Sequence, residues 1–322
     1  MRLPRIKLQG KSTVYHCMSR IVGKEHLLDE LCRYKMQGLI KRQCRFCGID
    51  LVSHCVMTNH FHMLVRVPAE QDPSDEELIQ RMEALYGKDG RLVQIAREGL
   101  EKQGKVPEEI RSRMLRRMGD ISVLLQEIKQ RFTRWYNRRM DRPGTMWAER
   151  FRSTVVEDNP EVVLRLACYI DLNPVRGALT GDPKDYRFSS YGAAVRGDKQ
   201  AREALMGLLG VSDWEEASRL YRQLLYRTAG RAGSSGKVVL GEKEIMEVIK
   251  EGGKLSFGDV LMLRIRHITD GVALGSREFV EEVFVRYRNK FGLKRKSGAR
   301  RIPGMLLGEV YALRDLKVNA IE

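Results

Sequence analysis

The hydrophobic and polar positions in the first part of the chain predict a sheet with helices. Residues 13–20 (TVYHCMSR) and 49–57 (IDLVSHCVM) are rich in the residue types that favour strands. Between them, apolar positions recur at helical spacing from about Leu27 to Cys44. The short turn Thr58-Asn59 leads directly into His60–Val67 (HFHMLVRV), which predicts a β-hairpin.

The pattern changes to helix after the hairpin. Residues from about 73 to 118 are polar and charged with helical spacing, so we expect an inserted helical segment there. A stronger helix spans Ile121–Met140, and the turn Arg142-Pro143-Gly144 ends it. Residues 145–157 (TMWAERFRSTVVE) are then typical of a strand.

A further helix is expected after that strand. Asn159 is a favourable N-cap, and Pro160 fits the first helical position. The helix is predicted to run to about Asn173 and to stop at Pro174, because proline disfavours the helical conformation in the residue before it. The order β-α-β-β-α-β-α predicts an α+β fold of the ferredoxin-like class, with an antiparallel sheet and helices on one face.

Composition narrows the function classes. A net charge of +16 and a pI near 9.7 favour a polyanionic partner, in the first place nucleic acid, over an inert basic surface. No apolar run approaches the roughly 18 residues of a membrane span, and no signal peptide is evident, so we expect a cytoplasmic, nucleoid-associated protein with no membrane partner. The six cysteines are then expected to be thiols. Cys44 and Cys47 have the spacing of half a zinc site, but two buried small residues at a helix end are the better interpretation.

The chain is predicted to have three parts. These are a domain over 1–195, a helical extension and linker over 196–237 that ends in the small polar stretch AGRAGSSGK, and a mostly helical module over 238–322. In this module Ser276 is placed to cap a helix. Residues 286–301 contain eight basic residues and no acidic one, so the module is either an additional DNA-binding element or a solvated basic tail.

Two pairs of residues are the first candidates for chemistry. His60 and His62 are two positions apart on a strand, so both side chains point to one face, and Phe61 points to the other. Such a pair can chelate a divalent metal, although an isolated HxH is more often structural. Tyr169 and Asn173 lie one turn apart on the same face of a helix. Taken alone, Tyr169 and Asn173 are more simply interpreted as a core tyrosine and a helix-terminal asparagine.

Basic residues are concentrated before and within the last strand. Residues 111–155 contain 12 basic and 4 acidic residues, with Trp135, Tyr136 and Trp147 interleaved. Cations bind phosphates and aromatic faces stack on unpaired bases, so we predict DNA binding; the alternative is a solvated helix face with buried aromatics. The residues predicted to contact DNA are Arg131, Arg134, Arg138, Arg139, Arg150, Arg152, Trp147 and, beyond this stretch, Arg176.

Five stretches together resemble a known family. Met57–Val65 (MTNHFHMLV) resembles the HUH metal motif of single-tyrosine transposases, and Tyr169–Arg176 (YIDLNPVR) is similar to their Y-I-x-x-N-P-V-R signature. Tyr15–Arg20, Trp147–Ser153 and Asp185–Tyr191 resemble the first strand, the strand before the tyrosine helix and the segment after it. The pieces occur in the family's order, and the branch that they resemble most is that of the REP-associated tyrosine transposases.

The resemblance spans roughly residues 10–195 and implies a nick-and-join reaction on single-stranded DNA that forms hairpins. Tyr169 would be the nucleophile that forms a 5′-phosphotyrosine intermediate. His60, His62 and Asn173 would bind a divalent metal, Mg²⁺ or Mn²⁺. Tyr136 is a rival nucleophile, but no matching ligand lies one turn from it.

Two other functions fit the same residues. One is a catalytically silent protein that binds a DNA hairpin, although such a protein has no need of an intact set of His60, His62, Tyr169 and Asn173. The other is a metal-dependent RNA nuclease on the same scaffold. The sequence leaves open the target hairpin, the choice between monomer and homodimer, and whether the tyrosine acts in cis or in trans.

Overall fold

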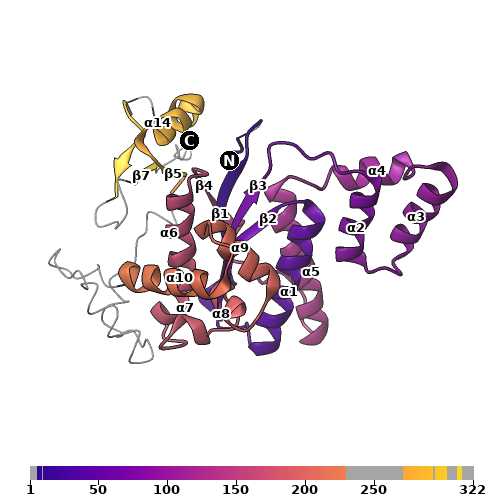
Figure 1. Cartoon of the computed structure of the whole chain (residues 1–322), viewed down its shortest axis with the longest axis horizontal. Coiled ribbons are helices and arrows are strands. Elements are labelled where there is room, and N and C mark those ends of the chain that lie inside the picture. Colours follow the sequence, from indigo (N-terminus) through magenta and orange to yellow (C-terminus); the bar gives the residue numbers. More distant parts are fainter. Residues whose placement is uncertain (1–5, 9, 230–270, 293, 303–309, 314–322) are drawn as a thin grey trace.

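The structure is a computed structural model of the 322-residue chain, and it describes residues 6–8, 10–229, 271–292, 294–302 and 310–313 (Figure 1). The strands are β1 (Thr13–Arg20), β2 (Asp50–Val56), β3 (His60–Val67), β4 (Arg152–Val156), β5 (Ala273–Gly275), β6 (Arg300–Arg301) and β7 (Tyr311–Leu313). The α-helices are α1 (Glu30–Cys47), α2 (Asp75–Tyr86), α3 (Arg91–Gln103), α4 (Glu108–Leu115), α5 (Ile121–Arg139), α6 (Pro160–Asp171), α7 (Asn173–Arg176), α8 (Ser190–Val195), α9 (Lys199–Leu209), α10 (Trp214–Ala229) and α14 (Arg277–Arg286). The 3-10 helices are η1 (Val22–Lys24), η2 (Pro183–Asp185) and η3 (Arg288–Lys290).

The strands that the structure describes form one sheet in the order β2-β3-β1-β4-β5-β7-β6. Its first four strands pair antiparallel throughout, which confirms the α+β, ferredoxin-like class predicted from the sequence. In the register of β1 with β3, Met18 lies opposite His62 and Arg20 opposite His60. β5 pairs parallel with β4, so the complete sheet is mixed rather than purely antiparallel.

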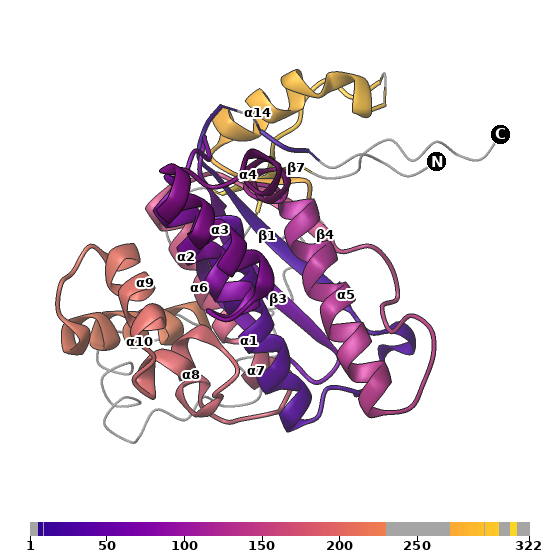
Figure 2. The same ribbon diagram turned by 90° about the vertical axis from the view of Figure 1, so that its right-hand side faces the viewer.

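Helices cover both faces of this sheet, which corrects the prediction of helices on one face. α1 and α5 pack side by side over one face (Figure 2), where Phe61 contacts Trp147 and Trp147 contacts Phe132 of α5. α6 covers the other face, where the ring of Tyr169 lies 6.2 Å from that of His62. The histidine face is therefore not open, because the apolar side of α6 also needs a surface on which to bury itself.

The start of α6 agrees with the sequence prediction, and its end does not. Asn159 caps the helix, because its side chain accepts a hydrogen bond from the backbone N–H of Glu161, and Pro160 occupies the first turn as predicted. The helix ends at Asp171 rather than Asn173. Pro174 does not end it; this proline lies in the first turn of α7, where a missing N–H costs nothing.

The strand expected over residues 145–157 is shorter than predicted. Only Arg152–Val156 pairs as β4, and the preceding loop makes a single bridge between Ile21 and Trp147. The apolar residues of this loop mimic a strand in the sequence because they are buried in the core: Met146, Trp147 and Phe151 are all buried. The apolar pattern of this segment therefore reflects the burial of its side chains and not pairing as a strand.

The inserted segment is helical, as predicted. α2, α3 and α4 stand out from one side of the molecule (Figure 1). They are tied to the body by a cluster in which Arg117 donates to both carboxylate oxygens of Glu127 on α5, each at 2.7 Å, and also bonds Tyr86. Gln43 of α1 donates to the same carboxylate. Charge pairing therefore fixes the base of the insert.

The described residues of the C-terminal part differ from the separate, mostly helical module that was expected. β5 and β7 join the sheet, and α14 packs against both of them. Ser276 caps α14 by accepting from Phe279 N–H, as the sequence predicted, and it also donates to Glu157 beside β4. Tyr287 donates to the Lys7 carbonyl near the N-terminus. The predicted linker after Ala229 lies outside the described residues.

The two cysteines with half-zinc spacing are core residues. Cys44 and Cys47 are buried in the last turns of α1, and burial raises the pKa of both thiols, for Cys47 to about 12. Both side chains belong to the apolar core, and Sγ of Cys47 also donates to the Arg117 carbonyl. This confirms the interpretation as buried small residues. Within the described ranges, no helix has the length and apolar character that crossing a membrane requires.

Candidate active site

The candidate site begins with the two histidines of β3. His60 and His62 share one face of the strand, and their ring centroids are 5.0 Å apart. His62 is only 2% exposed, while His60 is partly exposed at the start of the strand. The strand can hold both imidazoles inside the fold because its other face, which carries Phe61, Met63 and Val65, anchors it in the apolar core.

A third histidine, which the sequence did not single out, completes the group. His16 lies on β1, and its Nε2 is 3.0 Å from Nδ1 of His62, with the two rings stacked at 11°. The sequence pointed to His16 only indirectly. His16 is on the first predicted strand, and only the register of β1 with β3 brings it beside His62.

Both histidines of β3 have Nδ1 engaged. Nδ1 of His60 is 2.6 Å from Oδ1 of Asn59, and Nδ1 of His62 bonds His16. This leaves the two Nε2 atoms as the candidate metal ligands, since a ligating histidine usually uses its second nitrogen for an orienting hydrogen bond. Burial lowers the pKa of His60 to about 4 and that of His62 well below its ordinary value. Both imidazoles are therefore neutral at physiological pH, which is the state that binds a metal.

Tyr169 is held against these histidines by α6. Its ring lies 6.3 Å from His16 and 6.2 Å from His62, edge-on to both, and the residue is 8% exposed. The guanidinium of Arg176 lies over the same ring at 4.4 Å and donates to the Tyr169 carbonyl at 2.9 Å. Residues far apart in the sequence, on β1, β3, α6 and α7, thus converge around one tyrosine.

Asn173 is fixed at the junction of α6 and α7. Its Nδ2 donates to the carbonyls of Tyr169 at 3.0 Å and Ile170 at 3.1 Å. These bonds orient the amide and leave Oδ1 as its candidate ligand atom. No group of three or more His, Cys, Asp or Glu side chains placed for a metal occurs among the described residues. Two neutral imidazoles with an amide oxygen are a donor set that fits Mn²⁺, and Mg²⁺ less well, because Mg²⁺ prefers oxygen.

Asp171 anchors the helix that carries Tyr169. This buried carboxylate accepts from the Tyr191 backbone N–H at 3.0 Å and from the Tyr221 hydroxyl at 2.7 Å, and burial raises its pKa to about 6. Tyr221 belongs to α10, which the sequence assigned to an extension outside the first domain. The extension is therefore part of the structure that positions the tyrosine.

The basic residues predicted to bind DNA separate into two groups. Arg134 and Arg150 line a cavity of about 780 Å³ between α5 and the loop before β4, together with Lys129. Arg150 and Arg152 also line an adjoining cavity of about 580 Å³ at the end of β1, together with Arg20, which lies opposite His60 in the sheet. Four basic residues of the list line neither cavity. Arg131 is close to Glu127, Arg139 pairs with Asp29, Arg138 is exposed elsewhere on α5, and Arg176 lies over the ring of Tyr169.

Two predicted aromatic contacts turn out to be core contacts. Trp147 is 8% exposed, contacts Phe61, and donates from Nε1 to the Thr133 hydroxyl at 2.9 Å. Most of its ring is therefore taken up by core contacts, and the remaining part lines the cavity that contains Arg134 and Arg150. Tyr136, the rival nucleophile, is buried against Phe132. Trp147 packs against α5 and Tyr136 is a buried residue of that helix, on the opposite face of the sheet from His62.

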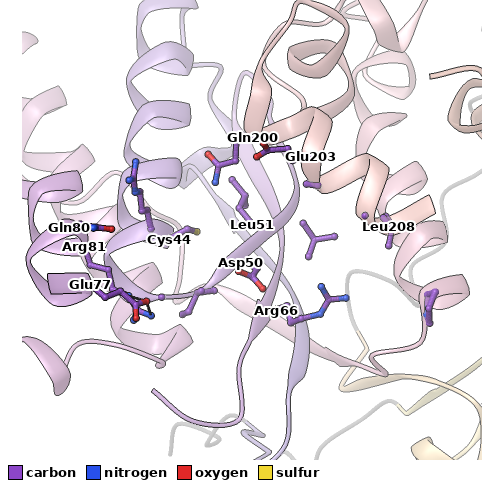
Figure 3. Close-up of a pocket in the computed structure, with 17 residues that line it drawn as sticks. Cys44, Asp50, Leu51, Arg66, Glu77, Gln80, Arg81, Gln200, Glu203 and Leu208 are labelled. Atoms are coloured by element: carbon purple, nitrogen blue, oxygen red, sulfur yellow. Dashed lines mark hydrogen bonds and ion pairs between the residues drawn. The ribbon is translucent and has the colours of Figure 1, made fainter. Parts of the chain in front are cut away.

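A further cavity of about 650 Å³ lies away from the site. It runs beside the edge strand β2, between α2 and α9, and its lining includes Asp50, Arg66 and Glu203 (Figure 3). His16, His60, His62 and Tyr169 are not among its lining residues. Acidic and basic side chains are mixed there, which does not favour a phosphate backbone as occupant.

Residues 10–96 match the model of the family described as IS200-like transposases, which confirms the resemblance for this part of the chain and supports a transposase-like function. The matched segment contains His16, His60 and His62 and ends before Tyr169.

A solved structure, described as a REP-associated tyrosine transposase bound to a REP hairpin, is similar over 61% of this chain and 86% of that chain. The sequence identity is 16% and the TM-score is 0.39. None of the curated proteins compared with the chain matches it.

Proposed function

We propose that this protein nicks and rejoins single-stranded DNA with Tyr169 as the nucleophile. One observation carries the proposal: His60 and His62 of β3 and Tyr169 of α6 meet in one group, and the two histidines fall within the segment that matches the IS200-like transposases. The sequence motifs that contain these residues also occur in the order found in that family. A tyrosine that is buried near two histidines by chance would not explain this order.

In the proposed first step, the phenolic oxygen of Tyr169 attacks a phosphorus atom of the strand. The bond from phosphorus to the 3′-oxygen breaks, the 3′-oxygen takes up a proton and leaves as a 3′-OH, and the phenol proton passes to solvent. The product is a 5′-phosphotyrosine. In the second step a 3′-OH attacks this phosphorus, the tyrosine oxygen leaves and is protonated, and the strand is rejoined. The number of phosphodiester bonds is conserved, so no external energy source is needed.

The residues around Tyr169 have assigned parts in this proposal. Arg176, which lies over the ring, adds positive charge where the phosphate approaches. His60, His62 and Asn173 would hold a divalent metal, which when bound supplies a positive charge that polarises the scissile phosphate. His16 holds His62 in orientation through its hydrogen bond. α6 keeps water from the buried side of the tyrosine.

The proposed substrate is single-stranded DNA that forms hairpins, as in repeats at the ends of mobile elements or in extragenic DNA. The net charge of +16 and the basic residues that line the two cavities before β4 support a nucleic acid partner. The hairpin itself rests on the motif resemblance. The same test, carried out with mixed variants, also addresses whether the protein acts as a monomer or a homodimer. Such mixtures reveal a tyrosine that acts in trans.

The test is a search for the covalent intermediate. Labelled single-stranded hairpins from the repeats that flank the gene are incubated with the protein and Mn²⁺ or Mg²⁺, and the products are separated on denaturing gels. We expect a protein–DNA band that is absent for Tyr169→Phe and His60→Ala but present for Tyr136→Phe, a control that also removes one buried hydroxyl. A native complex without a covalent band under either metal would favour a silent binding protein. A requirement for a 2′-OH would favour an RNA nuclease.

A further inference from the structure

Arg165 of α6 is a buried arginine whose side chain makes no hydrogen bond within the described part of the chain. The residue is 6% exposed, and none of its three side-chain nitrogens has a hydrogen-bond partner among the residues that the structure describes. Its nearest opposite charge is Glu161, one turn earlier, at 3.5 Å; that carboxylate is 67% exposed and is too far for a hydrogen bond at this position.

Two other poorly exposed arginines in the described structure, Arg117 and Arg222, have hydrogen-bond partners. Arg222, with 13% of its side chain exposed, donates to Asp182 at 2.6 Å and to the Tyr226 hydroxyl at 2.8 Å. Arg117 pairs with Glu127 in the cluster at the base of the insert. A guanidinium removed from water without such partners is strongly unfavourable, and burial accordingly lowers the pKa of Arg165. A group of this kind indicates that a partner is brought by a ligand.

The position of Arg165 identifies the type of ligand. It is four residues before Tyr169 in one continuous helix, so the two side chains leave the same face of α6 one turn apart. Arg176, whose Nε is likewise buried without a hydrogen-bond partner in the described structure, lies beyond Tyr169 and covers its ring. Unsatisfied guanidinium donors therefore occur both before and after the tyrosine in the sequence, one on α6 and one on α7.

We infer that Arg165 binds a phosphate of the DNA strand next to the phosphate that Tyr169 attacks. The inference rests on the proposed function for the identity of the anion. Four residues of helix rise about 6 Å, so Arg165 is offset along the strand from the scissile position. Its planar fork of N–H donors matches two phosphate oxygens, which would supply the missing hydrogen bonds. Arg165 is thus a strand-positioning residue and not a catalytic one.

The proposal predicts opposite effects on stability and on binding. In Arg165→Met, an apolar side chain of similar length replaces a buried, unsatisfied charge, so the Tm of the free protein should be unchanged or higher. A fluorescein-labelled oligo-dT strand should bind roughly 10-fold more weakly, and the slope of log K against log salt should fall by about 0.7, as expected for one lost phosphate contact. Arg97→Met, a substitution of an exposed arginine paired with Glu83 on the insert, is the matched control and should change neither quantity.

The readouts are thermal unfolding and fluorescence anisotropy over a series of salt concentrations. Wild-type affinity and slope in Arg165→Met would overturn the proposal, as would a lowered Tm with an unchanged slope. If Arg165→Met does not fold, Arg165→Lys keeps the charge and loses the fork; it should keep the slope and bind several-fold more weakly, and wild-type affinity would overturn the proposal.

The covalent assay separates this inference from the proposed function. If oligo-dT binding depends on Arg165 but no protein–DNA adduct forms on any hairpin, the phosphate site is correct and the nicking reaction is wrong. If the adduct forms through Tyr169 and Arg165→Met binds like the wild type, the reaction is correct and the phosphate site is wrong.

Discussion

The two faces of the central sheet are built from different chemistry. Under α1 and α5, the middle of the sheet presents Phe61, Met63 and Val65, and all three are completely buried among apolar neighbours. Under α6, the same strands present His62 and, from β1, His16. One set of strands therefore carries an apolar core on one side and a buried polar group on the other.

The difference between the two faces indicates which residues stabilise the fold. Apolar burial on the α1–α5 face stabilises the fold and can offset the cost of desolvating imidazoles and a guanidinium on the α6 face. Groups that are costly to bury are retained where a reaction or a ligand needs them. Substitutions on the two faces should therefore separate: one face should control stability, and the other should control binding.

The largest effect is expected on the apolar face. Phe61→Ala removes a completely buried ring that contacts Trp147, and should lower the free energy of unfolding by about 3–5 kcal/mol. Urea denaturation followed by circular dichroism measures this. His62→Ala is the matched substitution on the other face of the same strand, and should cost less because it also removes a desolvated imidazole. An equal loss for both variants would contradict the division between the faces.

The next effect concerns metal binding. His16→Phe removes the hydrogen bond that orients His62, so Mn²⁺ affinity, measured by calorimetry or electron paramagnetic resonance, should fall by about 10- to 100-fold. His16→Asn keeps a group that can hydrogen-bond to Nδ1 and should recover part of the affinity. A structural role alone would change stability in both variants and leave the affinity of the folded protein unchanged.

A smaller effect is expected in the pH dependence of stability. His54 is buried, with Ser190 Oγ at 2.7 Å and Gln37 Nε2 at 2.9 Å; Lys41 and Asp198 are the charges that act on it. Burial lowers its pKa from 6.5 to about 3, so between these values the unfolded chain binds the additional proton. The contribution of His54 is complete above pH 6.5 and decreases as pH falls, by about 1.4 kcal/mol per pH unit.

His54→Gln removes this titration, so its unfolding free energy should depend less steeply on pH than that of the wild type between pH 6 and about 4.5. Denaturant titrations at several pH values give the slope. The acidic Asp171 works in the opposite direction, because its pKa is raised to about 6 and its protonated form is favoured in the folded state. Parallel pH profiles for wild type and His54→Gln would show that His54 is not desolvated.

The smallest effect is expected at the surface. Arg134 lines the cavity between α5 and the loop before β4, whereas Arg131 lies near Glu127 at the base of the insert. Arg134→Gln should reduce the salt slope of oligo-dT binding by about 0.7, and Arg131→Gln should leave it nearly unchanged. Equal salt slopes for the two variants would show that a position in the lining of this cavity does not distinguish the basic residues of α5 that contact DNA from those that do not.

Much of the fold was predictable because it depends on local signals. β1 and β3 have the bounds that the pattern predicted, and the cap at Asn159 places the start of α6 correctly. The position of α6 on the second face was not predictable, because alternation identifies a buried face without naming the element that covers it. The strands at residues 273–275 and 311–313 were too short to give any periodicity.

The candidate site divides in the same way. His60 and His62 could be found from their spacing, and Tyr169 with Asn173 from a motif. His16 and Arg165 could not, since one depends on the register between β1 and β3 and the other on the absence of a hydrogen-bond partner in the folded chain. Trp147 was assigned to DNA because composition does not distinguish a buried aromatic ring from an exposed one.

The parallel pairing of β5 with β4 has a consequence for the order of folding. Thr154 beside the histidine face donates to the carbonyl of Gly271, 117 residues later, and β5 follows at once. During synthesis the outer edge of β4 therefore stays unpaired until almost the whole chain has left the ribosome. Exposed strand edges recruit other chains, and contacts so distant in sequence form slowly. A fragment limited to residues 1–195 would keep the histidines and Tyr169 but would be prone to aggregate along that edge.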